Sequence, residues 1–210
     1  MTLKKLSDLV TRPDLIEIEE ESIVMTEFAV ERYFQRLFFI GLRRKGVNYQ
    51  QAEEIVKRKR TEVGNLLQDI LKNYILSAEQ YDDFKYVNSL QVLGSLFMNY
   101  TLPQRNSIAH GKYSCPDEET IILCIKINIG YILEIEEFLK TRLSLSAFDT
   151  PKKWGAAVVR RKLTDGEIEK SYGVKNSGGM NKHKAMHKFR SICFINEHNF
   201  LNAVGMNIIK

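Results

Sequence analysis

Cysteine and proline are scarce in this chain of 210 residues, which contains three cysteines and four prolines. The cysteines are odd in number and none belongs to a C-x-x-C pair, which argues against both a disulfide framework and a zinc knuckle. We therefore expect free and mostly packed thiols at Cys115, Cys124 and Cys193.

Long apolar runs are also missing. No window reaches the roughly 18 uninterrupted apolar residues that a membrane span requires, and residues 1–10 alternate lysines with leucines instead of forming the core of a secretory signal. The composition, with 44% apolar and 27% charged residues, is typical of a globular protein. The sequence therefore predicts a cytoplasmic protein with no membrane partner.

The charge is distributed unevenly along the chain. Residues 1–150 carry 19 Lys and Arg against 22 Asp and Glu, whereas residues 151–210 carry 12 against 4. A basic segment can follow a phosphate backbone without reading its sequence, although lysines also simply keep a surface soluble. We expect residues 148–210 to form a small basic C-terminal extension.

Most of the chain before that extension has apolar residues at helical spacing. Expected helices cover residues 23–44, 48–71 and 77–103, the second and third opening with capping-box spacings at Asn48/Gln51 and Ser77/Gln80. A fourth is expected to open after Pro116 and to bury a stripe that runs to Leu139. Pro103 is expected to end the third helix. Long amphipathic helices joined by short links predict an all-α bundle of four to five helices over residues 1–147.

The extension has weaker signals. Ala156 to Val159, then the Asp165-Gly166 pair and Ile168 to Val174, suggest a short β-hairpin around a D-G turn. A last helix is expected over Lys182 to Leu201. His183 and His187 have the i, i+4 spacing of a metal pair, but the lysines around them would repel a cation. We expect neither a metal nor another cofactor.

The stretch with the clearest chemistry is L-P-Q-R-N-S-I-A-H-G-K, residues 102–112. On a helix, Arg105 and His110 lie within about 140° of each other and Asn106 shares a face with His110. Histidine can act as general base or acid on a ribose 2′-hydroxyl, arginine can stabilise charge on a phosphate, and asparagine can orient either group. Such a site needs no metal.

One histidine cannot readily serve as base and acid on opposite sides of the same phosphate. Two copies of the motif meeting across a twofold axis would supply both groups, so the chemistry predicts a homodimer. Gln104 and Lys112 flank the catalytic candidates Arg105, Asn106 and His110, and we expect them to contact the RNA.

The run R-N-S-I-A-H-G between two long helices resembles the motif of the HEPN superfamily, an arginine and a histidine separated by four to six residues with a polar residue after the arginine. The resemblance implies a dimeric, metal-independent endoribonuclease, commonly a toxin or effector in bacterial defence or toxin–antitoxin systems, with an antitoxin or defence partner. HEPN toxins silenced by nucleotidyl transfer have a tyrosine two positions after the histidine. Here Lys112 stands there and the tyrosine is Tyr113.

Three other interpretations fit the same residues. Arg105 could pair with an acidic neighbour while Asn106 caps the helix and His110 is a satisfied core histidine. The domain could be a non-catalytic HEPN-like module that binds RNA or a protein, with the basic extension adding affinity. A magnesium-dependent DNA nuclease ranks last, because residues 151–210 show no paired carboxylates beside a lysine.

Overall fold

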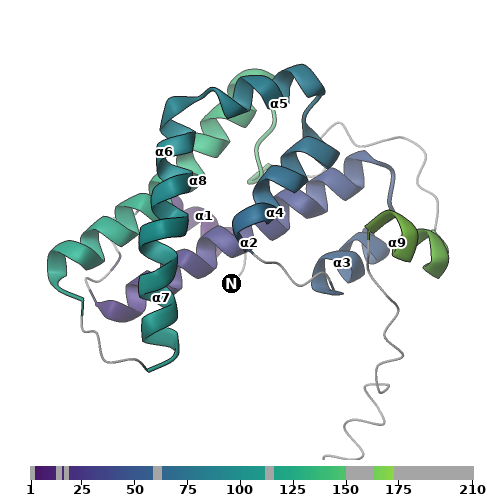
Figure 1. The fold of residues 1–210 in the computed structure, drawn as a ribbon. Coiled ribbons are helices and arrows are strands. Elements are labelled where there is room, and N and C mark those ends of the chain that lie inside the picture. Colours follow the sequence, from purple (N-terminus) through teal and green to yellow (C-terminus); the bar gives the residue numbers. More distant parts are fainter. Residues whose placement is uncertain are drawn as a thin grey trace, which may run out of the picture. The chain divides into compact units, whose positions relative to one another are not determined.

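The computed structural model of the chain describes residues 3–12, 16, 19–58, 63–111, 116–149 and 163–172. These residues are mostly helical and form no strand, which confirms the expected all-α class (Figure 1). The elements are α1 (Leu3–Thr11), α2 (Glu20–Arg44), α3 (Tyr49–Arg58), α4 (Val63–Ile70), η2 (Leu71–Ile75), α5 (Ala78–Lys85), α6 (Asn88–Leu96), η3 (Phe97–Thr101), α7 (Leu102–Ala109), α8 (Glu118–Leu143) and α9 (Asp165–Tyr172). The two elements η2 and η3 are single π-helical turns.

Helix α2 is the centre of the bundle. It packs against α8, η2, α7, α3 and α4, and its apolar stripe is almost entirely inaccessible to solvent. Burial of such side chains is the main favourable contribution to folding. The largest fully buried side chains of the bundle include Tyr33, Phe34, Leu37, Phe38, Phe97 and Leu67.

The predicted helix starts are largely confirmed. Ser77 and Gln80 form a complete capping box at the start of α5, and the side chain of Asp117 accepts a hydrogen bond from the Thr120 N–H at the start of α8. Gln51 also donates its N–H to Asn48 Oδ1, while its side-chain amide makes two hydrogen bonds, of 2.6 and 2.7 Å, with the backbone of Leu163. Side-chain caps thus fix where these helices begin.

The expectation that Pro103 ends a helix is wrong. Helices α6, η3 and α7 form one helical run over residues 88–109, seen as a single column in Figure 1, and Pro103 lies in the first turn of α7. A proline ring normally clashes with the carbonyl four residues before it. Here the Leu102 N–H bonds to the Phe97 carbonyl five residues back, and this wider turn accommodates the proline.

Two other expected elements differ from the structure. Residues 48–71 contain two helices, α3 and α4, separated by positions 59–62, which lie outside the described residues. The hairpin expected around Asp165-Gly166 is wrong over 165–172, where α9 forms instead. Asp165 and Glu167 stand in its first turn and Lys170 in its last, where the helix dipole favours those charges.

The chain divides into two compact units, Met1–Thr164 and Asp165–Lys210, and α9 belongs to the second. The boundary expected at residues 147/148 stays a prediction. The rest of the expected hairpin and the helix expected over residues 182–201 lie outside the described residues. None of the described helices combines the length and the apolar character needed to cross a bilayer.

Free thiols were expected, and Cys124 is a buried free cysteine whose burial raises the pKa of its thiol to about 11. A thiol with so high a pKa is a poor nucleophile at neutral pH, because the thiolate is the reactive form. Cys115 and Cys193 lie outside the described residues.

A buried carboxylate fixes the chain that follows α8. Glu136 is 2% exposed and accepts hydrogen bonds from the Tyr33 hydroxyl at 2.8 Å, the Ser146 hydroxyl at 2.6 Å and the Ala147 N–H at 2.8 Å. A buried charge is tolerated when its oxygens are satisfied in this way. Glu136 therefore joins α2, α8 and the segment after α8.

We expect Glu136→Ala to lower the free energy of unfolding by on the order of 3 kcal/mol, because it leaves three buried donors without an acceptor. Chemical denaturation measures this loss. Glu137→Ala is the matched control, since Glu137 is the exposed neighbour on the same helix, and its effect should stay within about 0.5 kcal/mol. Equal effects of the two substitutions would contradict a structural role of the buried carboxylate.

Candidate active site

Helix α7 carries the R-N-S-I-A-H segment along the surface of α2. Arg105 and Asn106 lie within the helix, and His110 follows its last residue as the C-cap. Gly111 has a φ of 61°, a backbone conformation that favours glycine, and it follows the C-cap of the helix. No residue of α7 is fully buried, so the motif lies at the surface of this chain.

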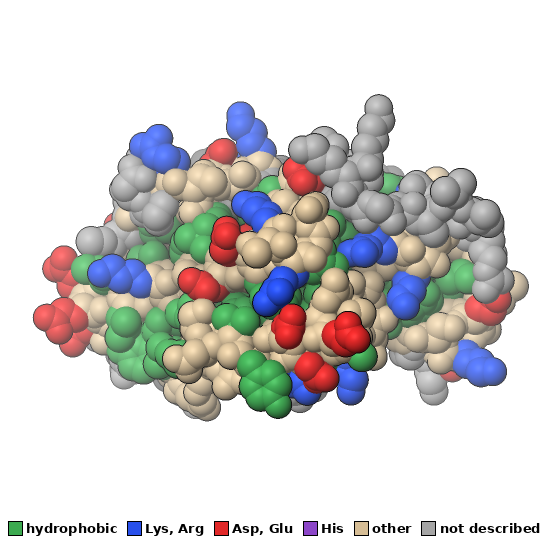
Figure 2. Space-filling view, turned by 90° about the horizontal axis from the view of Figure 1, so that it is seen from above, with side chains coloured by type: hydrophobic (Ala, Val, Ile, Leu, Met, Phe, Trp, Pro, Cys, Tyr) green, Lys and Arg blue, Asp and Glu red, His purple; other side chains and the backbone are tan. Residues whose placement is uncertain are grey.

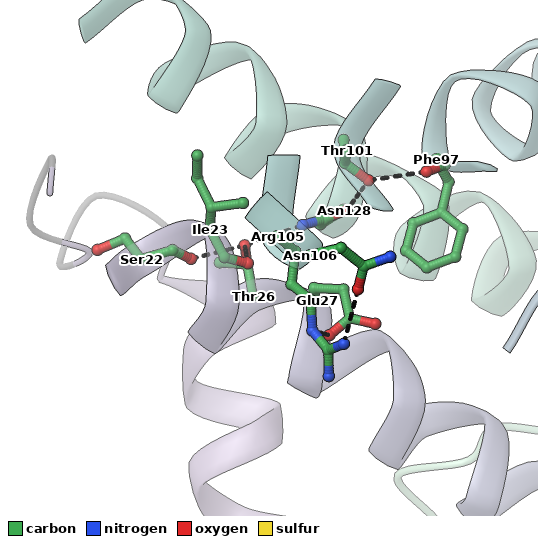
Figure 3. A network of polar contacts seen from close by, with 9 residues as sticks. All are labelled: Ser22, Ile23, Thr26, Glu27, Phe97, Thr101, Arg105, Asn106 and Asn128. Carbon is green, nitrogen blue, oxygen red and sulfur yellow. Dashed lines mark hydrogen bonds and ion pairs between the residues drawn. The ribbon is translucent and has the colours of Figure 1, made fainter. Parts of the chain in front are cut away.

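Arg105 is held by two polar contacts. Its Nε lies 3.1 Å from Oε2 of Glu27 on α2, and its Nη1 donates a 2.9 Å hydrogen bond to Oδ1 of Asn106 (Figure 3). The described residues provide no partner for Nη2, and the arginine side chain remains 29% exposed. A phosphate could therefore approach the open edge of a guanidinium whose orientation is already fixed.

Glu27 is an acidic side chain that is buried in the interior of the bundle. It is 0% exposed, and neither carboxylate oxygen has a well-aligned hydrogen bond among the described residues. Burial, and to a lesser degree repulsion by Glu31, raise the pKa of Glu27 from its ordinary 4.5 to about 7, although Arg105 opposes the shift. Near neutral pH, this carboxyl group exists in both protonation states.

A buried polar cluster lies one turn below the ion pair. The Thr101 hydroxyl lies 3.0 Å from Oδ1 of Asn128, whose amide donates a 3.0 Å hydrogen bond to the Thr26 hydroxyl (Figure 3). All three side chains are 0% exposed. Because Thr26 precedes Glu27 and Thr101 lies four residues before Arg105, the cluster sets the relative positions of α2, η3 and α8 beneath the pair.

The remaining predicted site residues are placed as follows. His110 is exposed, and its backbone N–H bonds to the Asn106 carbonyl at 3.0 Å. The described contacts include none between its imidazole and Arg105 or Asn106. Gln104 is half-buried on α7, whereas Lys112 and Tyr113 lie outside the described residues. The structure thus joins Arg105 to Asn106 and leaves the imidazole open to solvent at the end of the same helix.

The alternative in which Arg105, Asn106 and His110 have only structural roles agrees with the structure only in part. Arg105 does pair with an acidic neighbour, Glu27. Asn106, however, lies inside α7 and bonds to Arg105 instead of capping the helix, and His110 is exposed instead of belonging to the core. Packing therefore explains the arginine but does not account for the histidine.

The sequence analysis did not single out Glu27, although its position among apolar residues indicates that it is buried. It lies four residues after Ile23 and three before Val30, which places it on the apolar stripe of α2. A charged residue on a buried stripe requires a partner of opposite charge or a raised pKa. The position of that partner, more than 70 residues away, could not be read from the pattern.

No group of three or more His, Cys, Asp or Glu side chains gathers within the described ranges in a way that could hold a metal ion. His183 and His187 lie outside these ranges. Comparisons of the chain with protein-family models, with curated proteins and with solved structures found no match.

Proposed function

We propose that the chain is a metal-independent endoribonuclease of HEPN type, with Arg105 and His110 as its catalytic residues and Asn106 in support. The observation that carries the proposal is the oriented and partly exposed guanidinium of Arg105, on a helix that ends at an exposed histidine. The ion pair with Glu27 can be structural, but together with the hydrogen bond to Asn106 it fixes the orientation of a guanidinium that stays partly exposed. Cleavage of a phosphodiester uses the remaining donors of such a group.

In the proposed reaction the ribose 2′-oxygen attacks the adjacent phosphorus while the bond to the 5′-oxygen of the next nucleotide breaks. The products are a 2′,3′-cyclic phosphate and a free 5′-hydroxyl. His110 removes the proton of the 2′-hydroxyl, and a second imidazole donates a proton to the leaving oxygen. Arg105 stabilises the charge on the nonbridging phosphate oxygens, and Asn106 keeps the guanidinium in position.

The second imidazole is proposed to be His110 of another copy of the chain. An exposed histidine at a helix end can reach a site that it shares with a symmetry mate, whereas a core histidine could not. Gln104 and Lys112 are proposed to contact the RNA beside this site. The resemblance to HEPN ribonucleases further suggests a toxin or defence effector of the cytoplasm, controlled by an antitoxin or another partner protein.

The direct test is incubation of the purified protein with total RNA in the presence of a chelator, followed by mapping of the cleaved ends. We expect cyclic phosphate ends from the wild type and at least about a 100-fold slower reaction for His110→Ala. Ser107→Ala, on the same helix, is the control and should cleave at the wild-type rate. Cleavage by His110→Ala as fast as the wild type would refute the assignment. Salt-dependent RNA binding without any products would support the binding module instead.

A further inference from the structure

The guanidinium of Arg105 has a buried acid on one side and is open to solvent on the other. Its Nε lies 3.1 Å from Oε2 of Glu27, which is 0% exposed. Its Nη1 is held by Asn106, and in Figure 3 the remaining nitrogen points away from both contacts. A phosphate that approaches this nitrogen would therefore meet a cation whose charge is already partly neutralised from behind.

The negative charge of Glu27 depends on this one arginine. Neither of its oxygens accepts a well-aligned hydrogen bond from the described residues, and Nε of Arg105 is likewise without one. Buried carboxylates are normally stabilised by several hydrogen bonds, as Glu136 is. Arg105 supplies the interactions that favour the charged form of Glu27. Whatever competes for the guanidinium therefore acts on the proton of Glu27.

Within the described part of the chain, two charged side chains act on Glu27. On α2, Glu31 disfavours the carboxylate, and on α7, Arg105 favours it. The side chains that η3 and α8 place beneath the pair, Thr101 and Asn128, are neutral. Burial is the largest cause of a pKa of about 7 at Glu27, so one additional charge can change its protonation near neutral pH. Charged side chains at the protein surface, such as those in Figure 2, are solvated and respond far less.

A phosphate at the open edge of the guanidinium is such an additional charge. With hydrogen bonds of about 3 Å on either side of the guanidinium, the phosphate would lie roughly 8 Å from the carboxyl group of Glu27. At this distance and an effective dielectric constant of about 20, repulsion between the two negative charges changes the proton affinity of the carboxyl group on the order of tenfold. The bound phosphate thus favours the neutral acid.

We infer that a phosphate group bound at the open edge of Arg105 makes Glu27 take up a proton, so that RNA binds at this site more tightly as the pH falls. The inference rests on the proposed function, which places an RNA phosphate against Arg105. The proton passes from solvent to the carboxylate of Glu27, while the guanidinium keeps its charge and then neutralises the phosphate alone. Because the coupling is reciprocal, protonation of Glu27 strengthens RNA binding by the same factor.

The test measures binding of a labelled single-stranded RNA, in chelator, to the full chain with His110→Ala. This substitution prevents cleavage in the proposed mechanism and removes an imidazole from the site, because histidine side chains also titrate in the relevant pH range. We expect binding about fivefold tighter at pH 6 than at pH 8. At pH 7.5, calorimetry in buffers of different ionisation enthalpy should detect uptake of about half a proton per bound RNA.

Glu27→Gln, added to His110→Ala, imitates the protonated acid. It should strengthen binding at pH 8 about fivefold, leave binding at pH 6 unchanged and abolish the proton uptake. Glu31→Gln in the same background is the matched control, since it removes one negative charge from the same helix but leaves Glu27 in place. Its pH dependence should remain.

Arg105→Ala, also added to His110→Ala, separates the two possible failures. Weaker RNA binding by this variant, together with a pH dependence that Glu27→Gln leaves unchanged, would overturn the inference while the proposed RNA contact stands. RNA binding as tight as that of His110→Ala alone would show that no phosphate meets the guanidinium, and it would refute both the proposed function and the inference.

Discussion

Replacing Arg105 by alanine should slow RNA cleavage by at least about 100-fold, because it removes the oriented guanidinium of the proposed site. Arg105→Lys should recover only part of the rate. Lysine keeps the charge but cannot contact Glu27, Asn106 and a phosphate with one planar group. Initial rates on a defined RNA, measured in chelator, distinguish the three proteins.

The alanine variant needs a control for folding, since it leaves the carboxyl group of Glu27 buried without its counter-ion. Arg105→Ala combined with Glu27→Gln removes both partners, which is generally less destabilising than removing one. We expect the double variant to regain stability relative to Arg105→Ala but to stay inactive. Recovery of cleavage in the double variant would show that Arg105 has only a structural role.

The second large effect concerns the pH dependence of stability. The pKa of Glu27 is raised by burial from 4.5 to about 7, so the folded state holds this proton more tightly than the unfolded state. The contribution of the protonated Glu27 to the free energy of unfolding is fully present below pH 4.5, and it is lost as the pH rises through about 7. For a group with no exposure, this shift corresponds to on the order of 3 kcal/mol.

Glu27→Gln should therefore remove most of that pH dependence and make the protein more stable than the wild type at pH 8. Denaturant midpoints measured from pH 4.5 to 8 provide the comparison. Glu31→Gln is an informative second variant, because it removes the negative charge that adds to the effect of burial on the pKa of Glu27. It should lower that pKa only in part, so the pH range over which stability is lost should become narrower but remain. Parallel stability curves for the wild type and Glu27→Gln would contradict the raised pKa.

If Glu27→Gln is also slower in RNA cleavage, the carboxylate is a positioning residue that is kept at a cost in stability. Strained or electrostatically unfavourable groups of this kind occur preferentially at functional sites. A variant that is more stable and equally active would instead show that Glu27 has no part in the reaction.

The periodicity of apolar residues was sufficient to predict the helical class, and the capping spacings predicted most helix starts. Both signals come from residues within a few positions of one another in the sequence. Arg105 and Asn106 lie on one helix as predicted, whereas His110 is the C-cap that follows its last residue and precedes Gly111. The sequence analysis failed at Pro103, since the π-helical turn η3 depends on how this segment packs against α8, which the apolar pattern of the sequence does not reveal. It failed at 165–172 because a D-G pair is compatible with a turn or with the first turn of a helix.

The tertiary partners of the site could not be predicted in the same way. Contacts between Glu27 and Arg105, and among Thr26, Thr101 and Asn128, join helices that are far apart in sequence. A pattern within one helix can show that a polar residue needs a partner, but only the packing of the helices identifies it.

The π-helical turn over Phe97–Thr101 is equivalent to one extra amino acid inserted into an otherwise regular spiral. One residue corresponds to about 100° of rotation, so everything downstream of it is turned by that angle relative to α6. Shortening the chain by a single position there would give a more regular helix, yet the guanidinium of Arg105 would then point away from α2. The direction in which the cationic group faces is thus encoded several positions upstream, in a local irregularity and not in the motif itself.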